Sequence, residues 1–192
     1  MNTYDALTGD VRVGVLASTT GEGRLLERTG LVDVNGILVA GARVDTRQGS
    51  VVADGTANYM ITPAKASLSL VGRHHLYPPS ENMPQGVYLG DELDESELLA
   101  ALGAGMIDAI ARGAIGNSDA AYISGGRFVV GGLDDKVEYG GFTLAVEAAE
   151  LAACIDEKIN YLTEGGRLGY GEWVEAASVF INRAQMWNAR AN

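Results

Sequence analysis

The chain has 192 residues, of which 47% are hydrophobic and 20% are charged, and its net charge is −11 at pH 7. This composition excludes a disordered chain, and the single cysteine excludes an intrachain disulfide. The negative charge argues against direct contact with nucleic acid, since Lys and Arg supply most of the affinity for phosphates. Neither a signal-peptide pattern nor an apolar run of roughly 20 residues occurs, so we expect a soluble, cytoplasmic protein without membrane contact.

The first part of the chain predicts short strands separated by turns. Residues 11–17 are apolar and favour a strand, and residues 18–23 form a loop rich in Gly and hydroxyl side chains. Residues 24–29 also favour a strand, because Gly23 and Gly30 bracket them.

The strongest local signal is the stretch 31–40, in which Asn35-Gly36 separates two apolar segments. Both residue types tolerate the positive φ that a type I′ turn requires at its two central positions. The stretch predicts a β-hairpin at the centre of a sheet. Further strand signals follow at 50–53, 57–61 and 66–71, so residues 1–72 are predicted to form a Gly-rich antiparallel β barrel or sandwich.

Residues 73–90 interrupt this pattern with Pro78, Pro79 and Pro84 among polar residues. A long segment without periodicity is usually a functional loop or a linker. We therefore predict a Pro-containing arm or linker here, which separates the β part from a helical part over 91–192. The expected fold class is α+β.

The helical part opens with an acidic run at 91–97, which is typical of a helix start, and the predicted helix continues to about Gly113. A short β-hairpin is predicted over 121–130. Two further helices are predicted at 143–163 and 172–189, and the short connection between them favours an antiparallel pair.

No set of residues has the spacing of a catalytic or metal site, so we expect a non-enzymatic protein without cofactor. The only histidines, His74 and His75, are too few for a zinc site, and the loop 18–24 lacks the nucleotide-binding glycine patterns. Such a loop after a strand can still hold phosphate through backbone N–H groups. The alternative is therefore a small-molecule or nucleotide-binding protein, with hydrolysis as one option, that uses this loop and the segment 73–75. Its ligand-binding residues would be Thr20, Arg24, His74 and His75.

The segments GDVRVGVLA, NGILVAGARV and GSVVADGT lie within residues 9–72 and are rich in Gly, Ala and Val. In composition they resemble the β domains of tailed-phage virion proteins, such as head decoration or connector proteins. The resemblance implies a structural protein that assembles by subunit contacts with itself or with other virion subunits. It implies a location in the virion after assembly, and it transfers no functional residue.

Burial of surface between subunits is the mechanism that this interpretation requires. The expected partner-binding residues are Arg73 and Tyr77 beside the arm, with Trp173, Phe180 and Trp187 on one face of the last helix. Aromatic residues and Arg are enriched in protein interfaces.

Overall fold

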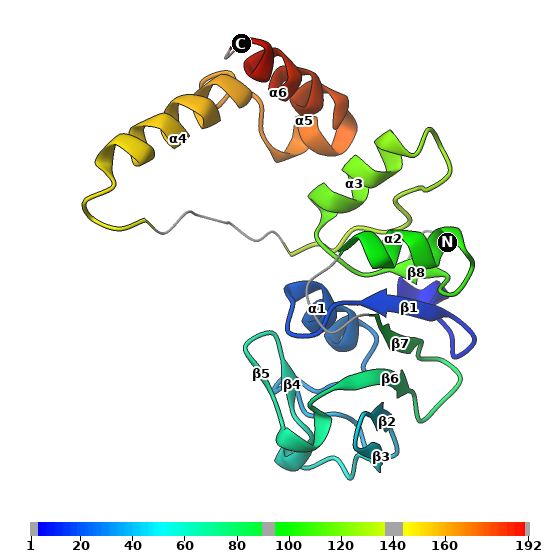
Figure 1. Ribbon diagram of the computed structural model, residues 1–192. Coiled ribbons are helices and arrows are strands. Elements are labelled where there is room, and N and C mark those ends of the chain that lie inside the picture. The colour runs from blue at the N-terminus through cyan, green and yellow to red at the C-terminus, as the bar shows by residue number, and fades with distance from the viewer. Residues whose placement is uncertain (1–3, 90–94, 137–143, 191–192) are drawn as a thin grey trace. The chain divides into compact units, whose positions relative to one another are not determined.

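The computed structural model describes residues 4–89, 95–136 and 144–190. It divides the chain into two compact units, Met1–Gly113 and Ala114–Asn192. The first unit contains every strand of the described residues and two α-helices, and the second unit contains four α-helices (Figure 1). The α+β class expected from the sequence is therefore confirmed.

A six-stranded mixed sheet forms the centre of the first unit, in the order β3-β2-β6-β7-β1-β8. β1 is parallel to both β7 and β8, whereas the pairs β2–β3, β2–β6 and β6–β7 are antiparallel. The sheet does not close into a barrel, so the closed-barrel form of the prediction is wrong. The strands are β1 (Arg12–Val15), β2 (Arg43–Thr46), β3 (Gly49–Val52), β6 (Arg73–Tyr77), β7 (Gln85–Tyr88) and β8 (Ala109–Ile110).

Helices α1 (Thr20–Arg28) and α2 (Glu95–Gly103) cover opposite faces of β1. Leu25 and Leu26 of α1 share one hydrophobic cluster with Val13 and Val15, while Leu98 of α2 belongs to a second cluster. Gly14 leaves room on the α2 face of β1. A Cβ added there would lie 2.4 Å from the side chain of Ile107, which belongs to the second cluster.

The strand predicted over residues 24–29 is wrong, because these residues belong to α1 and the turn after it. Thr19 caps the helix, with its side-chain oxygen accepting the backbone N–H of Glu22. Gly21 is needed in the first turn for close packing: a Cβ there would lie 2.6 Å from the carbonyl oxygen of Ala111. Gly21 therefore serves the contact between α1 and the chain after β8, and Gly23 serves the contact of α1 with Pro63.

The chain reverses near Asn35-Gly36, but outside the central sheet. The predicted type I′ turn is wrong, because Gly36 takes positive φ and Asn35 does not, and the N–H of Gly36 donates to the carbonyl of Asp33. Gly36 has a φ of +76°, and Val32 and Leu38 form an isolated antiparallel bridge across the reversal. The side chain of Asp33 accepts the N–H groups of Asn35 and Ile37 and so holds the turn. The segments predicted as strands over 57–61 and 66–71 instead contain one-turn 3₁₀ helices and the two-residue strands β4 (Ile61–Thr62) and β5 (Lys65–Ala66).

The predicted arm over residues 73–90 is wrong, because it supplies β6 and β7 to the middle of the sheet. Pro78, Pro79 and Pro84 lie in the connection between these strands, where a residue without an N–H removes no hydrogen bond from the sheet. The boundary between the compact units follows Gly113 and not this segment.

The second unit contains α3 (Ala114–Ile123), α4 (Ala149–Leu162), α5 (Tyr170–Glu175) and α6 (Ser178–Arg190). The hairpin predicted over 121–130 is wrong, since α3 ends there and Gly125 and Gly126 take positive φ in the following turn. The helix predicted up to Gly113 ends at Gly103 and is followed by β8. Residues 91–94 of the acidic run lie outside the described residues.

Helices α4 and α6 meet at the C-terminal end of α4. The ring of Tyr161 lies 5.1 Å from that of Trp187, and the guanidinium groups of Arg183 and Arg190 lie 4.9 and 4.5 Å from the centre of the Tyr161 ring. Arg183 also donates to the carbonyl of Leu162. These contacts hold α6 against the C-terminal end of α4, and the antiparallel arrangement of the two helices stays a prediction.

The two units differ strongly in their apolar burial. Among the described residues, eighteen of the nineteen buried hydrophobic side chains belong to the first unit, and Trp173 is the other. We therefore expect residues 1–113 produced alone to unfold cooperatively on heating, and residues 114–192 produced alone to show no cooperative transition. Circular dichroism of the two fragments checks this. A sharp transition in the 114–192 fragment would contradict it.

Candidate functional site

The turn from β1 into α1 has the most organised polar contacts of the first unit. The hydroxyl of Thr19 donates to the carbonyl of Leu16 at 2.8 Å, and the N–H of Ser18 donates to the carboxylate of Glu22 at 2.7 Å. Ser18 has a φ of +61°, an uncommon conformation for a residue other than Gly. Glu22 therefore holds the turn in a shape that the backbone disfavours by itself.

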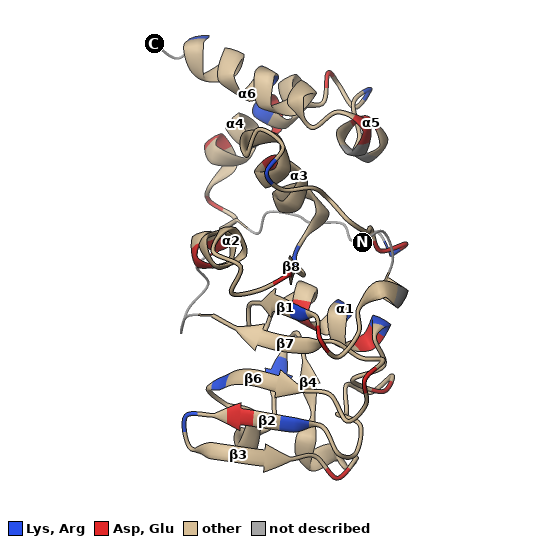
Figure 2. Cartoon of the chain, turned by 90° about the vertical axis from the view of Figure 1, so that its right-hand side faces the viewer, with Lys and Arg blue, Asp and Glu red and all other residues tan. Residues whose placement is uncertain are grey.

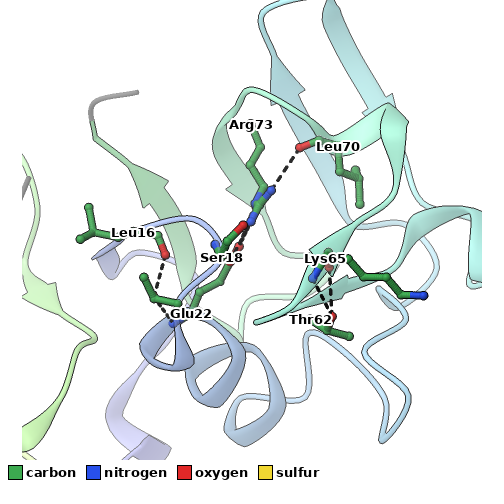
Figure 3. A network of polar contacts seen from close by, with 8 residues as sticks. Leu16, Ser18, Glu22, Thr62, Lys65, Leu70 and Arg73 are labelled. Carbon is green, nitrogen blue, oxygen red and sulfur yellow. Dashed lines mark hydrogen bonds and ion pairs between the residues drawn. The ribbon is translucent and has the colours of Figure 1, made fainter. Parts of the chain in front are cut away.

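Glu22 forms a buried ion pair with Arg73 of β6 (Figure 3). Nε and Nη2 of Arg73 donate to the two carboxylate oxygens of Glu22, each at 2.7 Å, and Nη1 donates to the carbonyl of Leu70 at 3.3 Å. The side chain of Glu22 is 0% exposed and that of Arg73 is 4% exposed. A buried charge pair needs this two-pronged geometry to offset the loss of water.

A β-bulge brings Arg73 to Glu22. Asp45 pairs with His75 and Thr46 pairs with Arg73, so His74 is an extra residue in β6. A regular strand would place Arg73 on the same face as His75. With the extra residue, Arg73 shares the buried face with Leu76, and His75 lies on the other face.

Tyr88 completes the buried polar group. The guanidinium of Arg73 lies 5.0 Å from the centre of the Tyr88 ring, but the Tyr88 hydroxyl has no hydrogen-bond partner among the described residues. Burial, together with the charge of Glu22, raises the pKa of the Tyr88 phenol well above its usual value. Buried hydroxyl groups normally form hydrogen bonds, so the Tyr88 hydroxyl is an exception among the described contacts.

Replacing Tyr88 by Phe is expected to raise the free energy of unfolding by about 1 kcal/mol at neutral pH, since it removes an unsatisfied buried hydroxyl. The phenol pKa is higher in the folded state, so the wild type loses stability as the pH rises above about 10. The variant lacks this contribution and should resist alkaline unfolding better. Denaturant melts at neutral and alkaline pH measure both effects, with Tyr77→Phe at a half-buried ring as control. Equal alkaline loss in wild type and Tyr88→Phe would contradict the prediction.

The first turn of α1 presents backbone donors at the edge where three parallel strands end. β1, β7 and β8 run in the same direction, so their carboxyl ends share this edge. In the described part of the chain, the N–H groups of Thr20 and Gly21 have no acceptor. The residue Thr20 is exposed. Unpaired N–H groups at a helix start attract anions.

Of the four residues predicted as ligand-binding, only Thr20 lies in this first turn. Arg24 pairs with Glu27 within α1. His74 is the exposed extra residue of the bulge, and Nε2 of His75 lies 2.8 Å from the side-chain oxygen of Gln85. Arg24 follows Thr20 by one turn and therefore lies on the same side of α1, whereas the two histidines belong to β6.

The residues predicted to bind a partner are also dispersed. Arg73 and Trp173 are each 7% exposed, so both side chains lie inside the fold, and their contact with a partner stays a prediction. Tyr77 is half-buried between His75, whose ring lies 3.9 Å away, and the guanidinium of Arg43. Phe180 is half-buried in α6, and so is Trp187, which packs on Tyr161.

The charges of the sheet are carried by few strands. Arg and Asp are the charged residues on β1, β2 and β6, whereas β3, β7 and β8 carry no charged residue (Figure 2). Among the described residues, no three His, Cys, Asp or Glu side chains gather so as to hold a metal ion, and no helix there is long and apolar enough to cross a bilayer. The candidate site is the first turn of α1, where the N–H groups of Thr20 and Gly21 have no acceptor among the described residues.

Comparisons with known proteins add no further candidate. No protein-family model matches this sequence, and searches of curated proteins and of solved structures found no significant match.

Proposed function

We propose that this protein binds a small anionic ligand at the first turn of α1. The observation that carries the proposal is the pair of unpaired N–H groups, at Thr20 and Gly21, placed where β1 and its parallel neighbours end. The partial positive charge of a helix start adds to their attraction for an anion. Phosphate and carboxylate groups have the matching chemistry.

The connections of the sheet support the same place. β1 continues into α1 on one face, and β7 is followed by α2 on the other face, although β1 and β7 are parallel neighbours. In open α/β sheets, ligands bind outside the carboxyl ends of the strands at such a switch between faces.

Inorganic phosphate is the probe for this proposal, with backbone amide resonances of the full chain as the readout. Titration should shift the amide signals of Thr20 and Gly21 saturably, because their N–H groups contact the anion. Absence of any saturable shift would overturn the proposal.

Two substitutions at Thr20 separate the N–H group from the hydroxyl. Thr20→Pro removes one donor at a position where helices accept proline, and the extended backbone of Thr19 suits a following proline. Thr20→Ala keeps the N–H group. We expect the proline variant to bind phosphate at least about tenfold more weakly than the alanine variant. Equal affinities would contradict backbone recognition.

A second function, assembly through subunit contacts, is supported by the helical unit. Nine large hydrophobic side chains are exposed among its described residues, against one that is buried. Leu151 and Ile159 lie on one side of α4 and are 51% and 41% exposed. We propose that a second copy of the chain covers this side of α4, as expected for a protein that assembles, a virion subunit included.

Sedimentation of the full chain over a range of concentrations tests the second function. Self-association should appear, and Leu151→Lys combined with Ile159→Lys should abolish it. Asp156→Lys is the control, since this residue of α4 is exposed and charged already. A monomer at every concentration, or dimers that persist in the double variant, would overturn self-assembly through α4.

A further inference from the structure

The central sheet ends at β3, whose outer side faces no other strand (Figure 2). Among the strands that the structure describes, β3 (Gly49–Val52) is bonded to β2 alone. Proteins protect such an edge with charged side chains, proline or a β-bulge, because its backbone groups are a template for another strand. β3 contains no charged residue and no proline, and the bulge beside β2 lies in β6. The opposite edge strand, β8, has only two residues and follows Asp108.

The hydrogen-bond pattern of β3 sets which of its backbone groups face outward. Ala53, directly after β3, donates to the carbonyl of Ala42, directly before β2. Every second residue of an antiparallel pair bonds to the partner strand, so Ala53 and Val51 face β2. The N–H and C=O groups of Ser50 and Val52 therefore point away from the sheet. Both residues are exposed, so another strand has access to these groups.

We propose that copies of the chain already paired through α4 join one another by antiparallel pairing of β3 with β3. This inference rests on the proposed assembly through α4 and adds the contact that extends it beyond a pair. A two-fold axis at Val51 places Ser50 of one copy opposite Val52 of the other. The outward N–H and C=O groups of both residues then bond across the contact, on both copies.

The side chains in and beside β3 suit a second copy of the same strand. Val51 packs against the hydrophobic cluster of the first unit and is half-buried. The axis places it beside Val51 of the other copy, where the two β-branched side chains cover each other. Arg47 precedes β3 and Asp54 follows it, so the two ends of the strand differ in charge. Antiparallel pairing brings the Arg47 end of one copy to the Asp54 end of the other.

One β3 contact is too small to hold two free copies together. It joins two strands of four residues each, and contacts that bury well below about 1,000 Å² are typical of transient encounters or crystal packing. Two chains paired through α4 carry two β3 edges. Two such pairs can therefore meet through both edges at once, and the second contact is then intramolecular. Association through β3 is expected only in chains that keep the α4 contact.

Sedimentation of the full chain, over the concentrations of the α4 test, measures growth beyond a pair. Wild type should form species larger than a pair. Val52→Pro removes an outward N–H group that does not bond to β2, and Val52→Lys brings the positive charges of two copies together, so both variants should remain pairs. Two controls should still form the larger species. Val52→Thr keeps the backbone and the β-branch, and Val34→Lys adds a charge at a side chain that is 93% exposed outside the central sheet.

Amide hydrogen exchange identifies the strand that makes the contact. In concentrated wild type, the N–H groups of Ser50 and Val52 should exchange at least about tenfold more slowly than in the Leu151→Lys/Ile159→Lys variant, which lacks the α4 contact. The N–H group of Val51 bonds to β2 and should exchange at the same rate in both proteins. Equal rates at Ser50 and Val52 in the two proteins would contradict pairing through β3.

The outcomes separate the two proposals. Pairs that never grow larger, or larger species that persist in either Val52→Pro or Val52→Lys, overturn the contact through β3 and leave assembly through α4 standing. Loss of the larger species in Val34→Lys also overturns it, since added charge alone would then be the cause. If Val52→Pro does not fold, Val52→Lys decides. A wild type that stays a monomer overturns the assembly itself and the inference with it.

Discussion

Replacing Arg73 by Met is expected to lower the free energy of unfolding by about 3–5 kcal/mol. The variant leaves the carboxyl group of Glu22 in a site where it is 0% exposed and where its main partner is missing. Met fills most of the space that the Arg side chain occupied, so loss of packing is the smaller part of the effect. Chemical denaturation of the full chain, followed by circular dichroism, measures the loss.

Two further variants identify the cause of that loss. Arg12→Met breaks the ion pair with Asp108, whose side chains are 38% and 40% exposed, and it should cost at most about 1 kcal/mol. Glu22→Gln/Arg73→Met removes both buried charges and should recover much of the stability lost in the single variant. A double variant that is less stable than Arg73→Met would show that the buried charge is not the cause.

Replacing Gly36 by Ala is the second large effect, expected to cost about 2–5 kcal/mol. The φ of +76° disfavours any residue with a Cβ by about 1–2 kcal/mol. A Cβ would also lie 2.6 Å from the carbonyl oxygen of Ile61, and forcing an atom into such a packed place costs typically about 1–3 kcal/mol. Because the neighbour is backbone, no side-chain rotation relieves the contact.

Gly105→Ala is the matched control for the Gly36 variant. Gly105 has nearly the same φ, +71°, but no atom lies within 4 Å of a Cβ added there. Its loss of stability should be limited to the conformational part, about 1–2 kcal/mol. Thermal or denaturant melts of both variants separate the two parts. Equal losses at Gly36 and Gly105 would contradict the role of the contact with Ile61.

Local signals in the sequence predicted the turns better than the sheet. The chain reverses near Asn35-Gly36 because Gly36 accepts a positive φ, a property of the residue itself, although Asn35 does not take the second positive φ of a type I′ turn. The strand β1 was also predictable from its run of apolar residues. The arm predicted over 73–90 failed because β6 and β7 are short and separated by prolines, and their pairing with distant strands leaves no local pattern.

The candidate site was predictable in one part only. Thr19 followed three residues later by Glu22 is a helix-start pattern, and it could have revealed α1 despite the two glycines. The partner of Glu22 could not be found this way. Alternation along β6 puts Arg73 with His75, and the bulge that reverses its side depends on pairing with β2. The orphaned hydroxyl of Tyr88 is likewise a result of tertiary packing.

The position of β1 has a consequence for the folding of a nascent chain. Its two neighbours in the sheet, β7 and β8, follow it only after β2, β3 and β6 have been synthesised. Until Gln85–Tyr88 have emerged from the ribosome, both edges of β1 lack the partners that they have in the finished sheet. The unit is therefore expected to fold late and slowly during translation, with β1 open to chaperones or to aggregation in the interval.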